Sequence, residues 1–99
     1  MKAVKVEPGR IPEIIEIANE LTALQEAVGG DIECVTIATD AAIICDEEGL
    51  LKGKPVNFRF CGLTIVGTAL FVGVDGEEFC DIDPGAVLLL VKELEGRKC

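Results

Sequence analysis

Carboxylates dominate the side chains of this sequence that could do chemistry. The chain of 99 residues holds 18 Asp and Glu against 9 Lys and Arg, and it has no His, Trp or Tyr. Without histidine, the Ser-His and Cys-His couples that activate a nucleophile cannot be built. Two carboxylates could act as general acid and base, but many such pairs exist in an acidic chain and no spacing singles one out. We therefore expect a protein that is not an enzyme.

The surplus of carboxylates gives a formal net charge of -9 at pH 7. Such a surface repels nucleic acid and anionic membrane and speeds the encounter with basic partners. The simplest interpretation is a solvated surface that keeps a small protein soluble. The alternative is an array of carboxylates that stands where a nucleic-acid-binding protein expects phosphates. Its candidate partner-binding residues are Glu13, Glu16, Glu20, Asp46, Glu47, Glu48, Glu77 and Glu78.

Metal and phosphate sites have less support in the sequence. The acidic segment from Asp75 to Asp83 suggests calcium, but its glycine comes second, whereas a calcium loop has it sixth. A hairpin turn followed by a helix cap explains the same residues, and no glycine-rich phosphate motif is present. We expect neither a metal nor a cofactor. A small nucleotide could still bind a basic spot, whose candidate residues are Lys52, Lys54, Asn57, Arg59 and Thr68.

The five cysteines form no C-x-x-C pair and, without histidine, no zinc site. Their odd number, and an amino terminus that alternates Lys and Val where a signal peptide is apolar, predict reduced thiols and a cytoplasmic location. Cys34, Cys45 and Cys80 have apolar neighbours, so we expect them to be buried. No apolar run is long enough to cross a bilayer.

The elements that must position these residues begin with a hairpin and a helix. Residues 2–6 alternate polar and apolar, as in a half-buried strand, and residues 11–17 repeat this period. Together they predict a first hairpin. Asn19 is a favourable N-cap for a helix that ends at Gly29 and Gly30.

The middle of the chain predicts further hairpins. Residues 31–38 and 41–45 are rich in β-branched residues and form a second hairpin, followed by an acidic turn and a loop over residues 46–57. Residues 58–60 suggest a short edge strand. The run from Leu63 to Val74 predicts one central strand, in which Gly67 indicates a bulge or a close backbone approach. An Asp-Gly turn then leads into a short strand over residues 77–80.

The last segment predicts a second helix. Asp83 is a favourable N-cap, Pro84 suits the first helical position, and Gly96 closes the element. A buried strand over residues 88–91 is the alternative. The expected fold class is α+β: a single compact domain over residues 1–99, with a mostly antiparallel sheet built from hairpins and two helices on one face.

These residues resemble an uncharacterised family, a domain of unknown function in small acidic proteins of bacteriophages and conjugative elements. The resemblance implies a genomic context rather than a chemistry: accessory genes, among which inhibitors of host defence are common. Four segments carry it: Met1-Lys2-Ala3 with Val6-Glu7-Pro8-Gly9; Leu24-Gln25 with Val28-Gly29-Gly30 and Ile32-Glu33; Glu47-Glu48-Gly49 with Gly53, Pro55 and Asn57; and Ile65-Val66-Gly67-Thr68 with Phe71-Val72-Gly73.

Charge and resemblance together predict an accessory protein of a phage or mobile element. It would inhibit a host protein with a basic surface, such as a CRISPR or restriction nuclease, by mimicking nucleic acid, without binding nucleic acid or membrane itself. An oligomer that sequesters a small nucleotide is a second possibility. A third is an assembly domain that forms homo-oligomers through its apolar C-terminal segment, residues 85–91.

Overall fold

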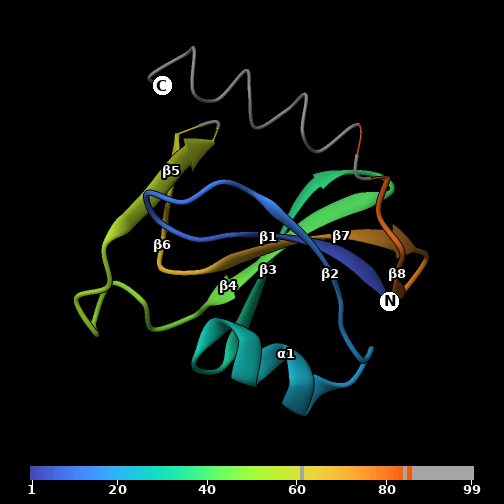
Figure 1. Cartoon of the computed structure of the whole chain (residues 1–99), viewed down its shortest axis with the longest axis horizontal. Coiled ribbons are helices and arrows are strands. Elements are labelled where there is room, and N and C mark those ends of the chain that lie inside the picture. Colours follow the sequence, from blue (N-terminus) through green and yellow to red (C-terminus); the bar gives the residue numbers. More distant parts are fainter. Residues whose placement is uncertain (61, 84, 86–99) are drawn as a thin grey trace.

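The computed structural model describes residues 1–60, 62–83 and 85, and these residues form eight strands and one helix (Figure 1). The element order is β1 (Lys2–Val6), β2 (Glu13–Glu16), α1 (Leu21–Val28), β3 (Ile32–Ala38), β4 (Ala41–Asp46), β5 (Val56–Phe60), β6 (Leu63–Val66), β7 (Ala69–Asp75) and β8 (Glu78–Cys80).

The strands form a large sheet and a small one. The large sheet has the order β2-β1-β7-β4-β3, and β8 extends it by pairing with the end of β7. In the described residues, the small sheet consists of β5 and β6. Every pairing is antiparallel, and β1–β2, β3–β4, β5–β6 and β7–β8 are hairpins of consecutive strands. The expected mostly antiparallel sheet built from hairpins is confirmed.

The prediction of one strand from Leu63 to Val74 is wrong, because this run divides between the two sheets. Gly67, with φ of 70°, turns the chain from β6 into β7, so it makes a corner and not a bulge. The Asn57 side chain fastens this corner by donating hydrogen bonds to Gly67 O at 2.8 Å and Val6 O at 2.7 Å. Both strands carry buried apolar residues, so hydropathy does not mark the break.

The large sheet buries apolar side chains on both faces. On one face, Leu24 and Val28 of α1 pack against residues of β4 and β7 that include Ile44 and Leu70. On the other face, the small sheet lies against β7, where the Phe58 ring stacks on Phe71 at 5.8 Å between centroids. Since β7 is covered on both faces, its sequence is continuously apolar rather than alternating.

Helix α1 differs from its prediction at the start and agrees with it at the end. Its N-cap is Glu20 and not Asn19, whose side-chain amide instead donates a hydrogen bond to Phe79 O at 2.9 Å. The helix ends at Gly29, whose φ of 82° is left-handed, as predicted.

The described residues contain this one helix, so two helices on one face are not observed there. The second predicted helix, over residues 83–96, lies almost entirely outside the described residues. None of the helical structure in the described residues is long and apolar enough to cross a membrane.

The three described cysteines are free thiols in different surroundings. Cys45 is buried, and its burial raises the pKa of the thiol to about 11. Cys80 is half-buried. The prediction that Cys34 is buried is wrong: it is exposed on β3, which is the last strand of the large sheet in the described part of the chain. The buried side chains of the helix-facing cluster include Ile44 of the neighbouring strand.

Candidate functional site

The strand directions sort the charged residues into two ends of the large sheet. Because neighbouring strands run antiparallel, β1 begins where β2, β7 and β3 end and where β4 begins. Figure 1 shows the amino terminus, the β3–β4 turn and the β7–β8 hairpin together on the right of the view. We call this end the acidic end, after its exposed carboxylates. They are Glu16, Glu20, Asp40, Asp75, Glu77, Glu78, Asp81 and Asp83.

Long-range hydrogen bonds hold the segments of the acidic end together. Val74 N–H donates to Asp40 O at 2.9 Å, which joins the β3–β4 turn to the end of β7. Lys2 N–H donates to Asp81 Oδ1 at 2.7 Å, and Ile82 N–H donates to Lys2 O at 3.0 Å, so the segment after β8 lies along β1. The acidic end is therefore assembled from segments that are up to 79 residues apart in the sequence.

Few cations balance the acidic end. Among the described residues, it holds the Lys2 side chain and the terminal amine of Met1. The amine lies 3.6 Å from Glu16 Oε2, and this is the ion pair that the described residues form there. The other carboxylates of the acidic end are exposed to solvent without a cationic partner in the described part of the chain. Their like charges leave a strongly negative surface.

The opposite end of the sheet, which we call the cation end, carries most of the described cations. These side chains are Lys5, Arg10, Lys52, Lys54 and Arg59. Four of them are already paired. Lys5 Nζ and Arg10 Nε lie 3.5 Å and 3.6 Å from the carboxylate of Glu7, and the two lysines of the β4–β5 loop pair with Asp46.

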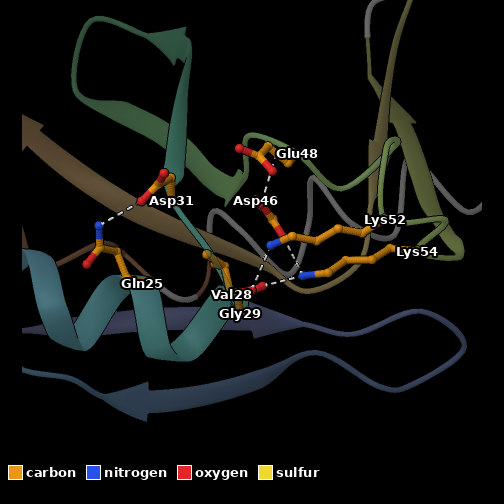
Figure 2. Close-up of polar contacts among 8 residues, drawn as sticks. All are labelled: Gln25, Val28, Gly29, Asp31, Asp46, Glu48, Lys52 and Lys54. Atoms are coloured by element: carbon orange, nitrogen blue, oxygen red, sulfur yellow. Dashed lines mark hydrogen bonds and ion pairs between the residues drawn. The ribbon is translucent and has the colours of Figure 1, made fainter.

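Asp46 is the centre of the cation end (Figure 2). Its side chain is 1% exposed, and its Oδ2 lies 2.6 Å from Lys54 Nζ and 2.9 Å from Lys52 Nζ. The Glu48 N–H donates to Oδ1 at 2.9 Å. The hydrogen bond from Lys54, supported by that from Lys52, outweighs burial and lowers the pKa of the Asp46 carboxyl well below its ordinary value.

The same two lysines cap helix α1. Lys54 Nζ donates to Val28 O at 2.7 Å, and Lys52 Nζ donates to Gly29 O at 3.1 Å (Figure 2). Cations are favourable at a helix carboxyl terminus, where carbonyl groups lack partners. Gly30 leaves room for this arrangement, because a Cβ there would lie 2.7 Å from Asp46 Oδ1. The lysines therefore perform a structural task, since each of them contacts both Asp46 and a carbonyl oxygen at the end of α1.

The structure divides the predicted carboxylate array. It brings Glu16, Glu20, Glu77 and Glu78 to the acidic end. It places Glu13, Glu47 and Glu48, all exposed, at the cation end. Asp46 is unsuitable for binding a partner, because its carboxylate is buried and already paired.

Sequence reasoning missed four members of the acidic end: Asp40, Asp75, Asp81 and Asp83. Asp40 lies in the β3–β4 turn and Asp75 precedes the β7–β8 turn, and the other two follow the last hairpin. The signal that could have found the first two is that alternate turns of an antiparallel sheet share one end.

The residues predicted to bind a small nucleotide do not line a common pocket. Lys52, Lys54 and Asn57 donate hydrogen bonds to protein oxygens, as described above. Arg59 is exposed on β5, and Thr68 is half-buried at the corner before β7. A hollow of about 530 Å³ lies along the β1–β2 loop instead, lined by Lys5, Glu7, Gly9, Arg10, Ile11, Pro12 and Glu13. Within the described ranges, no three Cys, Asp or Glu residues are arranged to hold a metal ion.

Comparison with known proteins gives a family. No curated protein and no solved structure matches the chain. The family model of a domain of unknown function, DUF3846, matches residues 1–95. Since this match spans nearly the whole sequence, the chain belongs to the DUF3846 family of domains of unknown function.

Proposed function

We propose that this protein is a binding protein whose acidic end docks on a basic surface of another protein. The observation that carries the proposal is the separation of charge between the two ends. At the cation end, five cations lie among the carboxylates, and four of them pair with Glu7 and Asp46. At the acidic end, eight exposed carboxylates face one lysine and the terminal amine among the described residues.

A nucleic-acid-binding protein is the partner class that fits this surface. Its groove carries cations that expect phosphates, and an array of carboxylates offers charge of the same sign. Long-range attraction then speeds association and makes it sensitive to salt. The resemblance to accessory proteins of phages and conjugative elements adds that the partner would be a host protein, such as a restriction or CRISPR nuclease.

The structure favours this proposal over sequestration of a small nucleotide. The lysines and the amide that would receive a phosphate or a base already bond to protein oxygens. Freeing them would leave the buried Asp46 carboxylate unpaired, which is costly. In the described part of the chain, the carboxylates of the acidic end make three internal contacts: Asp81 with the Lys2 backbone, Asp83 with the Gly85 N–H, and Glu16 with the terminal amine.

Two variants with the same net charge test the proposal. Glu77→Gln with Glu78→Gln neutralises part of the acidic end, and Glu47→Gln with Glu48→Gln removes the same charge from the cation end. Each immobilised variant captures proteins from a bacterial lysate at about 0.05 M and about 0.5 M salt, which spans strong to weak screening. Quantitative mass spectrometry then compares the captured proteins.

The expected result is a nucleic-acid-binding protein that wild type and the Glu47/Glu48 variant retain equally at low salt. The Glu77/Glu78 variant retains it about tenfold less, because each lost charge pair contributes up to about 1 kcal/mol. Added duplex DNA should compete for the same groove and release the partner. Equal retention by both variants, or a bound protein that DNA does not displace, would contradict the proposal.

A further inference from the structure

The two outer strands of the large sheet are protected to different degrees. The β2 edge has four residues, carries Glu13 and Glu16, and follows directly after Pro12. Short length, charge and proline are devices that prevent a sheet edge from pairing with another chain. The β3 edge has seven residues, without proline or lysine, and Glu33 is its one charged residue. A bulge between Thr36 and Ala38 interrupts its pairing with β4 near the turn, and the strand is regular from Ile32 to Thr36. No strand pairs with the outer side of β3 within the described part of the chain.

The hydrogen-bond pattern shows which β3 groups face outward. Glu47 N–H donates to Asp31 O at 2.8 Å. Together with the strand register, this bond shows which residues of β3 form hydrogen bonds to β4. In an antiparallel ladder, alternate residues bond to the neighbouring strand. Glu33 and Val35 therefore bond to β4. The N–H and C=O groups of Ile32, Cys34 and Thr36 point away from the sheet and are available to another strand.

We propose that two copies of this chain pair their β3 strands antiparallel, around a twofold axis at Val35. Val35 is the midpoint of Ile32–Ala38, so this register centres the two strands on each other. The residues next to the axis, Cys34 and Thr36, lie on the regular part of the strand before the bulge. The outward groups of Cys34 then bond to those of Thr36 of the second copy. Each Glu33 lies opposite Ile37 of the other copy, whereas an axis at Glu33 would place two like charges opposite each other.

The charge distribution supports a second copy as the occupant of this edge. Strand β3 runs from the cation end to the acidic end. Antiparallel pairing therefore places the acidic end of each copy beside the cation end of the other. This arrangement keeps the two sets of unpaired carboxylates apart, although each chain carries a net charge of -9. The paired strands themselves contain no residue of the acidic end, so a test of the strand pairing is separate from a test of the proposed function.

Proline substitution at matched positions tests the edge. Cys34→Pro removes an outward N–H of β3 and leaves the bonds to β4 in place, which an edge strand tolerates. Cys34→Ser is its control and retains the N–H. Ile14→Pro removes an outward N–H from β2. Met1 and Ile17 exchange backbone hydrogen bonds, and because bonded positions alternate along the strand, the N–H of Ile14 points away from β1. Sedimentation equilibrium under reducing conditions measures the mass of each, and circular dichroism checks the fold.

We expect wild type, Cys34→Ser and Ile14→Pro to be dimers and folded Cys34→Pro to be a monomer. A monomeric wild type at the highest soluble concentration would overturn the proposal. So would a folded Cys34→Pro variant that remains a dimer, or an Ile14→Pro variant that dissociates.

A cross-link tests the register and does not depend on the proline variant folding. In the Cys34→Ser background, Val35→Cys places two thiols opposite each other at a non-hydrogen-bonded pair, where the Cα separation suits a disulfide. Mild oxidation should link most of this variant into covalent dimers. The Glu33→Cys variant, also made with Cys34→Ser, should form no more covalent dimer than the Cys34→Ser protein alone. Absence of the Val35→Cys cross-link, or equal cross-linking of both variants, would overturn the twofold axis at Val35.

Discussion

The two ends of the large sheet differ in how their charged side chains are placed and paired. At the cation end, Asp46 lies in the interior with Lys52 and Lys54 around it, and these groups connect the β4–β5 loop to helix α1. At the acidic end, the carboxylates are exposed and, apart from Glu16, have no ion-pair partner in the described residues. Charged residues in this one small domain therefore divide between two roles: some stabilise the fold, and others form an outward-facing surface.

The largest expected effect comes from breaking the cation end. Asp46→Asn leaves the ammonium groups of Lys52 and Lys54 close together without their buried counter-ion. We expect the free energy of unfolding to fall by about 3 kcal/mol, as when one partner of a buried ion pair is removed. Glu47→Gln, at the exposed neighbouring position, should change it by less than about 0.5 kcal/mol. Urea unfolding measures both, and a similar change for the two variants would contradict the distinction.

The next effect is a dependence of stability on pH that belongs to the cation end. The lysines hold the folded-state pKa of Asp46 below the value of about 3.9 that an unfolded chain shows. Its contribution is therefore fully present above about pH 4 and is lost as the pH falls toward the lower folded-state value. Wild type should be more stable than Asp46→Asn at pH 7, and this gap should narrow steadily below pH 4. A gap of constant size, measured by urea unfolding across this range, would show that the ion pairs do not cause it.

A smaller effect should distinguish the two ends, because removing the same charge should change the free energy of unfolding in different ways at each end. Glu77→Gln with Glu78→Gln relieves repulsion and should raise the free energy of unfolding by about 0.5 kcal/mol at low salt. Glu47→Gln with Glu48→Gln removes the attraction between Glu48 and Lys52 and should leave the free energy of unfolding unchanged or lower it slightly. Both differences should disappear at high salt. Stabilisation of equal size by both pairs would mean that net charge alone matters.

Much of the local structure could be predicted from the sequence. The period of residues 2–6 and 11–17 predicted the β1–β2 hairpin, and Gly29 predicted the end of α1. The Asp-Gly turn after β7 predicted β8. These features depend on a few neighbouring residues, whose turn chemistry and alternation are visible in the chain itself.

The failures involve residues whose surroundings come from distant parts of the chain. Asp46 belongs to an acidic turn by its neighbours, but two lysines from the following loop and the end of α1 enclose it. Cys34 has apolar neighbours but lies on an outer strand. Gly67 interrupts an apolar run in which the strands on either side are both buried, in different sheets, so no change in hydropathy marks the corner.

Composition and short-range pattern were enough to predict the hairpins, the helix end, the excess of carboxylates and the lack of histidine chemistry. Which carboxylates share a surface, and which one is buried, depends on the tertiary structure. The strand order β2-β1-β7-β4-β3 brings together turns that are dozens of residues apart. Which distant turns become neighbours follows from which strands pair. Strand pairing depends on how the whole core packs rather than on any local segment.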